Sequence, residues 1–450
     1  MSALDLPLRE QAFRILSGDL DPAELLDDCL ARIEERNPDL NAVVATFPEE
    51  SRAMLEQSPE GPLRGVPVLI KDEWPLPWRA ETVGAASVPG VHLEPGESGP
   101  YRALRDAGAV IAGVANMHEL GSSSTGNTSL YGAAHNPWDL DRCPGGSSSG
   151  PGAAVAGGLV AGAVGADGLG SIRYPAAYCG LTGLKPTFGR SAMDGHHIPN
   201  TETIISGPLC RDAADCRLLA SALFEEEELA AGQVGPLRIG VAREPYWTDC
   251  VEGVREACEH ALEALRGSVG GELVEVELPD QELILPAALL IAQSEEAGRL
   301  TAANLNSLSP ELSVINRGVL KLRAVLPATL TARAVAARTR IRRGVAELFD
   351  DVDVLAWPTV PAGAPPLENP TIELPSGPIS ADAANARQGV LANLSGVPGV
   401  SVPVGLDGGM PIALQLLGAW GSDAMLLDAA EALERATERE FVELRPAAVA

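Results

Sequence analysis

Short apolar runs and longer amphipathic segments follow one another along this chain. Residues 65–72 (GVPVLIKD) and 107–116 (AGAVIAGVAN) have the length and apolar character of buried strands. Residues 8–36 instead carry apolar side chains at helical spacing, and the stretch DPAE at 21–24 has residue types that favour a helix start. Strands that alternate with helices predict an α/β protein.

The same alternation continues through the rest of the chain. Residues 153–162 suit a helix of small residues, and residues 161–167 suit a strand before a glycine turn. The part from 236 to 350 opens with the strand-like run LRIGVA and continues with charged amphipathic helices, such as 251–266. Further strands are predicted in VDVLAWPTVP, GVSVPVG and IALQLLG, followed by a final helix near 422–438.

The composition narrows the class of protein and its partners. With 450 residues, of which 46% are hydrophobic, the chain can bury a large core, and we predict a single domain over 1–450. The net charge of −28 argues against nucleic acid or an anionic membrane as a main partner, because phosphate binding needs clustered lysine and arginine. We therefore expect a small-molecule ligand. A monomer or homodimer is a separate expectation.

Cysteine usage and the first residues bear on the compartment. The seven cysteines form no CxxC pair, which favours reduced thiols. The first residues, MSALDLPLREQ, lack the basic and apolar segments of a signal peptide, and no run of about eighteen apolar residues occurs. These features predict a cytoplasmic protein without a membrane partner.

The tract CPGGSSSGPG at residues 143–152 admits several interpretations. A flexible linker would have polar flanks, whereas strand and helix candidates flank this tract on both sides. A phosphate loop would need a following lysine, which is absent. The tract satisfies the pattern GxSxG, which would make Ser148 the nucleophile of an α/β-hydrolase. That fold needs a later acid and then a histidine, and no histidine follows His260.

A fourth interpretation joins the tract to two other motifs. The chain has GVPVLIKD at 65–72, PGGSSSG at 144–150 and GADGLGSIRYPAAYCGLTGLKPTFGR at 165–190. These motifs, with Ser147 and Ser171 separated by 24 positions, resemble the amidase signature family. The similarity covers nearly the whole chain, with a motif core at about 65–220 and a more variable helical region at about 236–350. It implies a large mixed, twisted β-sheet flanked by helices on both faces.

The resemblance also implies a Ser-cisSer-Lys catalytic set. By their positions in the motifs, Ser171 is the nucleophile, Ser147 the bridging serine in a cis peptide and Lys71 the base. The residue types agree with this chemistry, because a serine hydroxyl needs an adjacent base to take its proton. Burial at the end of an apolar run would favour the neutral amine that Lys71 needs as a base, and Ser147 would relay the proton.

The glycine-rich turn before the nucleophile is the predicted oxyanion hole. Its candidate donors are the backbone N–H groups of Gly168, Leu169, Gly170 and Ser171, because such a turn can direct successive amides at one point. Leu169 stands where the family usually has glycine, and only its backbone is needed there. Glu73 stands where asparagine or a similar residue often follows the KD motif, and the sequence suggests no role for it.

Further residues are expected around this set. Met117, Ser148 and His197 are candidate substrate contacts. Asp167 and Arg173 lie beside the nucleophile in sequence, and we expect them to hold the turn by hydrogen bonds and an ion pair. No spacing of histidine, cysteine and aspartate matches a metal-ligand set, so we expect no metal, and no cofactor either.

These features predict a hydrolase of C–N bonds in small amides or carbamates, with activity on esters as well. The region around 282–330 is mostly apolar, so we expect it to cover a hydrophobic funnel for hydrophobic or aryl substrates. The alternative is the amidase subunit of a glutamine-dependent tRNA amidotransferase, which would need a partner chain. The segment MHEL at 117–120 and the strong acidity favour a stand-alone amidase.

Overall fold

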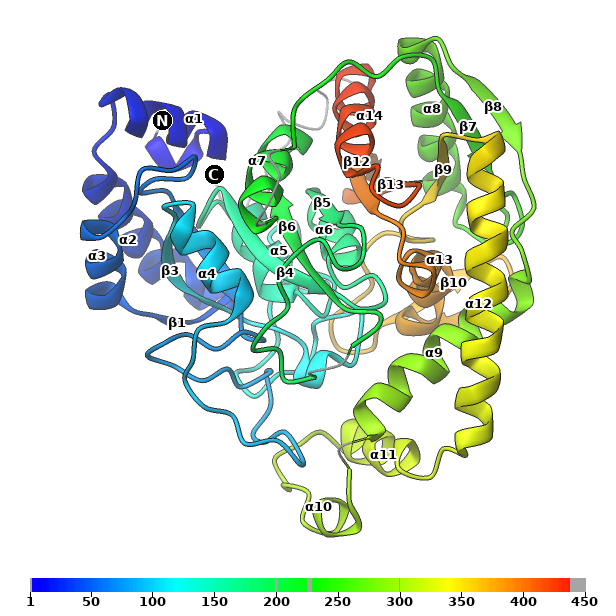
Figure 1. Cartoon of the computed structure of the whole chain (residues 1–450), viewed down its shortest axis with the longest axis horizontal. Coiled ribbons are helices and arrows are strands. Elements are labelled where there is room, and N and C mark those ends of the chain that lie inside the picture. The colour runs from blue at the N-terminus through cyan, green and yellow to red at the C-terminus, as the bar shows by residue number, and fades with distance from the viewer. Residues whose placement is uncertain (1, 199–200, 225–228, 299, 438–450) are drawn as a thin grey trace.

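The fold is built on one mixed β-sheet of 11 strands (Figure 1). The computed structural model describes residues 2–198, 201–224, 229–298 and 300–437. The strands of the sheet are β1 (Val43–Thr46), β2 (Pro67–Lys71), β3 (Val110–Ala115), β4 (Gly162–Asp167), β5 (Thr182–Lys185), β6 (Ile205–Cys210), β7 (Arg238–Val241), β8 (Glu272–Glu275), β9 (Val354–Pro358), β12 (Gly399–Asp407) and β13 (Met410–Gly418). Their order is β1-β3-β2-β4-β6-β5-β12-β13-β9-β7-β8, so the sheet joins both halves of the chain. A separate hairpin pairs β10 (Thr371–Leu374) with β11 (Gly377–Ser380).

Helices cover both faces of this sheet (Figure 1). They are α1 (Leu8–Ser17), α2 (Pro22–Leu40), α3 (Pro48–Glu56), α4 (Gly99–Asp106), α5 (Ser149–Ala156), α6 (Arg173–Cys179), α7 (Ala213–Leu223), α8 (Glu252–Val269), α9 (Gln281–Ala297), α10 (Ala302–Asn306), α11 (Val314–Arg323), α12 (Ala328–Asp351), α13 (Ala381–Ser395) and α14 (Asp423–Ala436). Helices α7, α14 and α8 pack in a row against the central strands, whereas α5 and α6 pack together on the other face. The expected α/β class is confirmed.

Two parallel strands bring distant sequence motifs to one edge of the sheet. β2 pairs in parallel with β4, with Ile70 opposite Val164. β2 ends at Lys71 and β4 ends at Asp167. Because parallel strands end at the same edge, the lysine lies beside the turn that carries Ser171. The carboxyl ends of such strands are where open α/β sheets bind their ligands.

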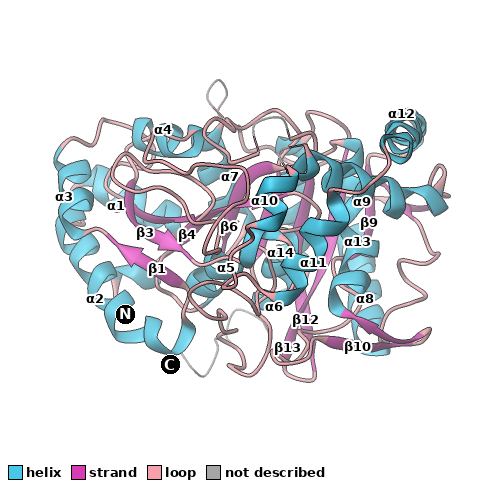
Figure 2. Cartoon of the chain, turned by 90° about the horizontal axis from the view of Figure 1, so that it is seen from below, coloured by secondary structure: helices cyan, strands magenta, loops and turns pink. Residues whose placement is uncertain are grey.

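Helices α8 to α12 lie in the helical region that the sequence predicts between about 236 and 350. α9 packs against α12, and α11 packs against α9. Figure 2, seen from below, shows α10 and α11 on the viewer's side of the central strands, which agrees with their place at the bottom of Figure 1. No helix in the described part of the chain is long and apolar enough to cross a membrane.

The predicted elements occur, and glycines end two of the helices earlier than expected. The helix expected at 8–36 is two helices, because Gly18 takes a left-handed φ of 80° and ends α1. α2 then begins where expected, with Asp21 accepting a hydrogen bond from the Ala23 N–H at 2.8 Å. The helix expected at 153–162 is α5, which starts at Ser149 and ends before a turn with a left-handed Gly158. Of the final helix expected near 422–438, residue 438 lies outside the described residues.

Candidate active site

Lys71 is buried at the carboxyl end of β2 and contacts two polar side chains. Its side chain is 1% exposed, and its Nζ lies 2.5 Å from Glu73 Oε2. The same nitrogen donates a hydrogen bond to Ser147 Oγ at 2.9 Å. All residues of β2 are buried, so the amine emerges from the apolar core only at this edge of the sheet. Two members of the expected catalytic set therefore lie within hydrogen-bond distance.

The serine-rich tract is a tightly packed turn, which excludes the flexible linker. The peptide bond between Gly146 and Ser147 is cis. The His118 N–H donates to the Ser147 carbonyl oxygen at 3.0 Å. A Cβ atom on Gly146 would come within 2.7 Å of the Ser123 carbonyl oxygen, so no side chain fits at this position.

Ser148 holds the tract against the turn after β4. Its side chain is fully buried, and its Oγ donates to the Ala166 carbonyl at 3.2 Å and accepts from the Ala166 N–H at 3.3 Å. Its backbone N–H donates to the Ser171 carbonyl oxygen at 3.2 Å. These bonds exclude Ser148 as the exposed nucleophile of a GxSxG elbow. They also correct its prediction as a substrate contact.

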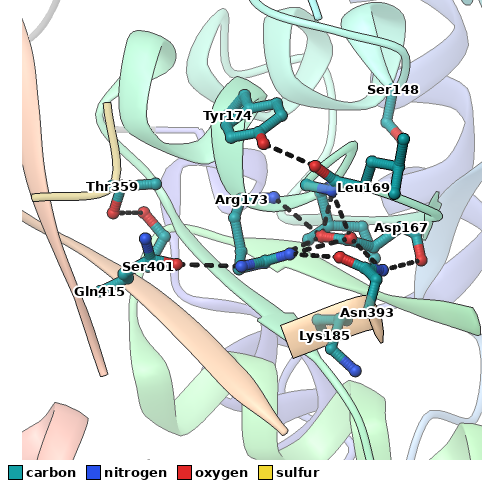
Figure 3. A network of polar contacts seen from close by, with 12 residues as sticks. Ser148, Asp167, Leu169, Arg173, Tyr174, Lys185, Thr359, Asn393, Ser401 and Gln415 are labelled. Atoms are coloured by element: carbon teal, nitrogen blue, oxygen red, sulfur yellow. Dashed lines mark hydrogen bonds and ion pairs between the residues drawn. The ribbon is translucent and has the colours of Figure 1, made fainter. Parts of the chain in front are cut away.

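Asp167 organises the turn that carries Ser171 (Figure 3). Its carboxylate accepts from the Gly170 N–H at 2.7 Å and from the Ile172 N–H at 3.2 Å. Arg173 Nε lies 3.1 Å from Asp167 Oδ2, and both side chains are fully buried. Burial alone would raise the pKa of Asp167, but the guanidinium of Arg173 outweighs it and lowers the pKa to about 2. The turn is therefore built around a permanent anion.

Two side chains from the second half of the chain complete this network (Figure 3). Arg173 donates from Nη1 to Gln415 Oε1 at 2.9 Å and from Nη2 to Asn393 Oδ1 at 2.7 Å. Asn393 Nδ2 donates in turn to the carbonyl and a carboxylate oxygen of Asp167, each at 2.9 Å. The expectation that Asp167 and Arg173 hold the turn is confirmed.

Three of the four predicted oxyanion donors remain candidates. Gly168, Leu169 and Ser171 line the cavity of the site. The Leu169 carbonyl accepts from Tyr174 Oη at 2.5 Å, which fixes the peptide that follows it. Gly170 is the exception, because its N–H is donated to Asp167. We therefore remove Gly170 from the candidate donors.

Lys71, Ser147 and Ser171 face one cavity of about 90 Å³. No hydrogen bond joins the two serine hydroxyls within the described residues, and catalytic hydrogen bonds often tighten only when substrate binds. The other residues of the wall are Glu73, Leu120, Gly121, Ser122, Ala166, Gly168, Leu169, His197, Ile198, Thr203, Ile204, Ala292, Gln293, Glu295, Glu296 and Arg323.

Of the predicted substrate contacts, the structure brings only His197 to this wall. Met117 is fully buried in a small apolar cluster with Val83 and Leu120. It therefore packs in the core beside the site and is not a substrate contact. Its neighbour His118 is also buried, and burial lowers its pKa to about 4, so its imidazole is neutral near pH 7.

The wall contributed by the helical region is polar where we expected an apolar funnel. α9 contributes Gln293, Glu295 and Glu296 beside one small apolar residue, Ala292, and α11 contributes Arg323. Arg323 donates from Nε to Gln293 and from Nη1 to Glu296. Other apolar residues of the same region either pack in the core, as Leu320 does, or point to solvent, as Val314 does at 75% exposure. The expected hydrophobic lining is wrong for this part of the wall.

Glu73 is the site residue that the sequence analysis missed. Besides Lys71 it contacts His196, whose Nε2 lies 3.0 Å from Glu73 Oε1. The ligand atoms of Glu73, His196 and His197 lie within 4.8 Å of one another, a spacing that a metal ion would accept. The Lys71 Nζ, however, already lies 2.5 Å from this carboxylate, so we describe a polar cluster that includes the lysine and not a metal centre. The available signal was the departure of Glu73 from the motif, directly beside the base.

Comparison with known proteins covers most of the chain. The family model described as Amidase matches residues 24–427. A glutamyl-tRNA(Gln) amidotransferase subunit of Halorhodospira halophila is 35% identical, over 94% of this chain and 95% of that protein. The corresponding subunit of Geobacter metallireducens is 30% identical, over 97% of this chain and 98% of that protein.

Solved structures of two related proteins also superpose on nearly the whole chain. A crystal structure of an amidase superposes with a TM-score of 0.89 at 30% identity, covering 96% of this chain and 99% of the other. The 6-aminohexanoate cyclic dimer hydrolase superposes with a TM-score of 0.85 at 26% identity, covering 99% and 100%. The motifs, the sheet and these matches together show that this chain is an enzyme of the amidase family.

Proposed function

We propose that this enzyme hydrolyses the C–N bond of small polar amides through an acyl-enzyme on Ser171. The observation that carries the proposal is the cavity shared by Lys71, Ser147 and Ser171, in which Lys71 Nζ lies 2.9 Å from Ser147 Oγ. A serine hydroxyl with a base in reach is the arrangement that nucleophilic catalysis requires.

In the proposed acylation, a bond from Ser171 Oγ to the carbonyl carbon replaces the bond from the amide nitrogen. Ser171 Oγ attacks the carbon while its proton moves to Ser147 Oγ, and Ser147 passes its own proton to Lys71 Nζ. The N–H groups of Gly168, Leu169 and Ser171 hold the negative charge that forms on the carbonyl oxygen. When the C–N bond breaks, the proton returns through Ser147 to the leaving nitrogen. Water then attacks the ester in the same way and frees Ser171.

The cavity favours a small and polar substrate. Its volume of about 90 Å³ is well below the roughly 300–1,000 Å³ of pockets that enclose drug-sized ligands. Gln293, Glu296 and Arg323 offer both donors and acceptors to a polar substituent. We therefore favour short amides with a polar group over the hydrophobic amides, aryl amides and aryl carbamates that the sequence suggested.

Two settings are compatible with this chemistry. In the first, the chain acts alone, a setting supported by its TM-score of 0.89 with a protein described as an amidase. In the second, it is the amidase subunit of a glutamine-dependent tRNA amidotransferase, a setting supported by its identity of 35% to a glutamyl-tRNA(Gln) amidotransferase subunit. Glutamine is itself a small polar amide, so the second setting fits the cavity equally well.

The test is a turnover assay with the purified full chain and with its Ser171→Ala variant as blank. The panel contains amide, ester and carbamate forms of one short acyl group, together with glutamine and asparagine. Turnover of short polar amides by the chain alone supports the first setting. Glutamine turnover that appears only with co-purified partner chains supports the second. Amide turnover retained by a folded Ser171→Ala variant would contradict the proposed nucleophile.

A further inference from the structure

The carboxylate of Glu73 lies between two buried cationic or hydrogen-bonding groups of the active site. One oxygen lies 2.5 Å from Lys71 Nζ, and the other lies 3.0 Å from His196 Nε2. The side chains of Lys71 and His196 are each 1% exposed, and that of Glu73 is 5% exposed. Water therefore screens this contact little, so the ion pair acts directly on the base.

His196 is oriented to donate to this carboxylate. Its Nε2 faces a carboxylate oxygen, which can only accept a hydrogen bond, so Nε2 carries a proton. Its Nδ1 lies 3.1 Å from the Ile198 N–H nitrogen and 3.2 Å from the Ile198 carbonyl oxygen. The ring packs against Trp74, with the ring centres 5.1 Å apart, and against His197, with the centres 4.4 Å apart. The position of the Glu73 carboxylate is therefore fixed from the side opposite the lysine contact.

Glu73 carries a negative charge at neutral pH. Burial alone would raise its pKa, but Lys71 first, and then His196 and His197, hold the pKa well below its usual range. A buried carboxylate of this kind favours the ammonium form of a neighbouring amine. The proposed acylation produces that form when Lys71 takes the proton that Ser171 releases.

We propose that Glu73 is a positioning residue that acts through Lys71. Its carboxylate aligns Nζ with Ser147 and stabilises the ammonium that forms as the proton moves from Ser171 through Ser147 to Lys71. Glu73 keeps its charge throughout, and His196 holds it in place. The inference rests on the proposed function, because it assigns a role within the same proton transfer.

Other charged and titratable groups face this contact and must be separated from it. Asp72 and Glu81 come from the loop after β2, His197 from the loop before β6, and His118 from the loop after β3. Glu295, Glu296 and Arg323 share the cavity from α9 and α11. Burial, with a smaller effect of Asp72 and Glu73, raises the pKa of Glu81 to about 7, so Glu81 changes its charge near neutral pH.

Replacing Glu73 by glutamine keeps the shape of the side chain and removes its charge. Two changes should follow from this one cause. The amine becomes available as a base at lower pH, because its ammonium form has lost a counter-charge, so the acid limb of the pH profile moves to lower pH. At the same time the maximal rate falls roughly 100-fold, because the ammonium formed during acylation is no longer stabilised.

The experiment measures covalent labelling of Ser171 by a small alkyl fluorophosphonate as a function of pH, using the full chain. This probe reports the activation of the serine without knowledge of the substrate. Wild type, Glu73→Gln, Glu73→Asp, Glu81→Gln and Glu434→Gln are compared, and Ser171→Ala is the blank. Glu434 is a control for loss of a shielded carboxyl group outside the site, since it lies on α14 against Thr182 and the Ala213 N–H, where burial raises its pKa to about 8.

The expected result is slow labelling of Glu73→Gln with an acid limb at lower pH. Glu73→Asp should recover part of the labelling rate, with the acid limb of its pH profile near that of wild type. The control variants Glu81→Gln and Glu434→Gln should keep the acid limb of wild type. If Glu73→Gln does not fold, Glu73→Asp and His196→Gln are compared instead, and labelling by both at the wild-type rate overturns the inference. A folded Glu73→Gln that labels with the rate and limb of wild type also overturns it. Failure of wild type to label at all would overturn the proposed function and this inference together, a different outcome.

Discussion

Arg173 and Asp167 form an ion pair of 3.1 Å with both side chains fully buried behind the catalytic turn. Asp167 also accepts hydrogen bonds from the backbone on both sides of Ser171, at Gly170 and Ile172. The ion pair therefore fixes the backbone of the candidate nucleophile and the direction of the neighbouring N–H groups. We therefore expect the stability of the protein and the geometry of the candidate active site to depend on the same contact.

Replacing Arg173 by methionine should destabilise the protein strongly. The change leaves the Asp167 carboxylate buried without its main counter-charge, and breaking such a pair costs about 3–5 kcal/mol of unfolding free energy. Urea denaturation followed by circular dichroism measures this loss. The control is Arg340→Met, which removes an arginine that is 58% exposed and pairs with Asp280, so little unfolding free energy should be lost because solvent screens this pair. Equal losses in the two variants would contradict the prediction.

Replacing Ser147 by alanine should remove the proton relay and leave the fold intact. Loss of general acid-base assistance predicts a fall in kcat for amides of about 10²- to 10⁴-fold. The fall should be smaller for activated esters, whose leaving groups need no proton. Ser149→Ala is the matched control, since this serine belongs to the same tract, is buried, and its Oγ has no hydrogen-bond partner among the described residues. Similar amide kinetics for the two variants would exclude Ser147 as the relay.

Replacing Arg323 by glutamine should weaken the binding of polar substrates. A hydrogen bond from a charged donor contributes about 1.5–3 kcal/mol, which corresponds to a rise in KM of roughly 10- to 150-fold. The effect should appear for amides that carry a carboxylate or amide substituent and be small for amides without one. Steady-state kinetics with both substrate types distinguishes lost recognition from a general loss of structure. An equal change in KM for both substrate types would argue against recognition of a polar substituent by Arg323.

Lys185 should make the stability of the protein depend on pH. This lysine is buried, its Nζ donates to the Pro186 carbonyl at 2.8 Å, and burial lowers its pKa from 10.5 to about 7. The unfolded chain then holds more protons than the folded chain between these two values, so this contribution to stability grows as the pH rises through that window.

Lys185→Met removes the titrating group and tests this dependence. The stability of the variant relative to wild type should be highest near pH 6.5, where the folded wild-type protein must bury the ammonium. It should fall progressively toward about pH 9.5. Denaturation midpoints of both proteins at several pH values give the difference directly. A difference that does not change with pH would show that the amine is not forced to lose its charge in the folded state.

The sequence predicted the site best where its parts lie within contiguous motifs. Lys71, Ser147 and the turn before Ser171 each belong to a short segment whose own backbone places it at the sheet edge. Gly170 was wrongly predicted as an oxyanion donor, because the sequence does not show which N–H of a glycine-rich turn already donates to another group. Asp167 takes this N–H at 2.7 Å.

Contacts between distant segments could not be predicted from one sequence. His196 approaches Glu73 from 123 positions further along the chain, and Asn393 approaches Arg173 from 220 positions away. The polarity of the helical wall was missed for a related reason. A mostly apolar segment does not show which of its side chains face the cavity, and here Arg323 does while Val314 faces solvent.

A main-chain hydrogen bond from the Ser148 N–H to the Ser171 carbonyl ties the two serine segments together, and one from the His118 N–H to the Ser147 carbonyl ties the first segment to the loop after β3. Such bonds do not depend on the side chains that a neighbouring residue carries. The helices α9 and α11, which supply Gln293 and Arg323, take no part in them. If the proposed roles hold, we expect substitutions on these helices to alter substrate choice while the spacing of Ser147 and Ser171 stays unchanged. Selection could then act on recognition and on bond cleavage as two nearly independent traits.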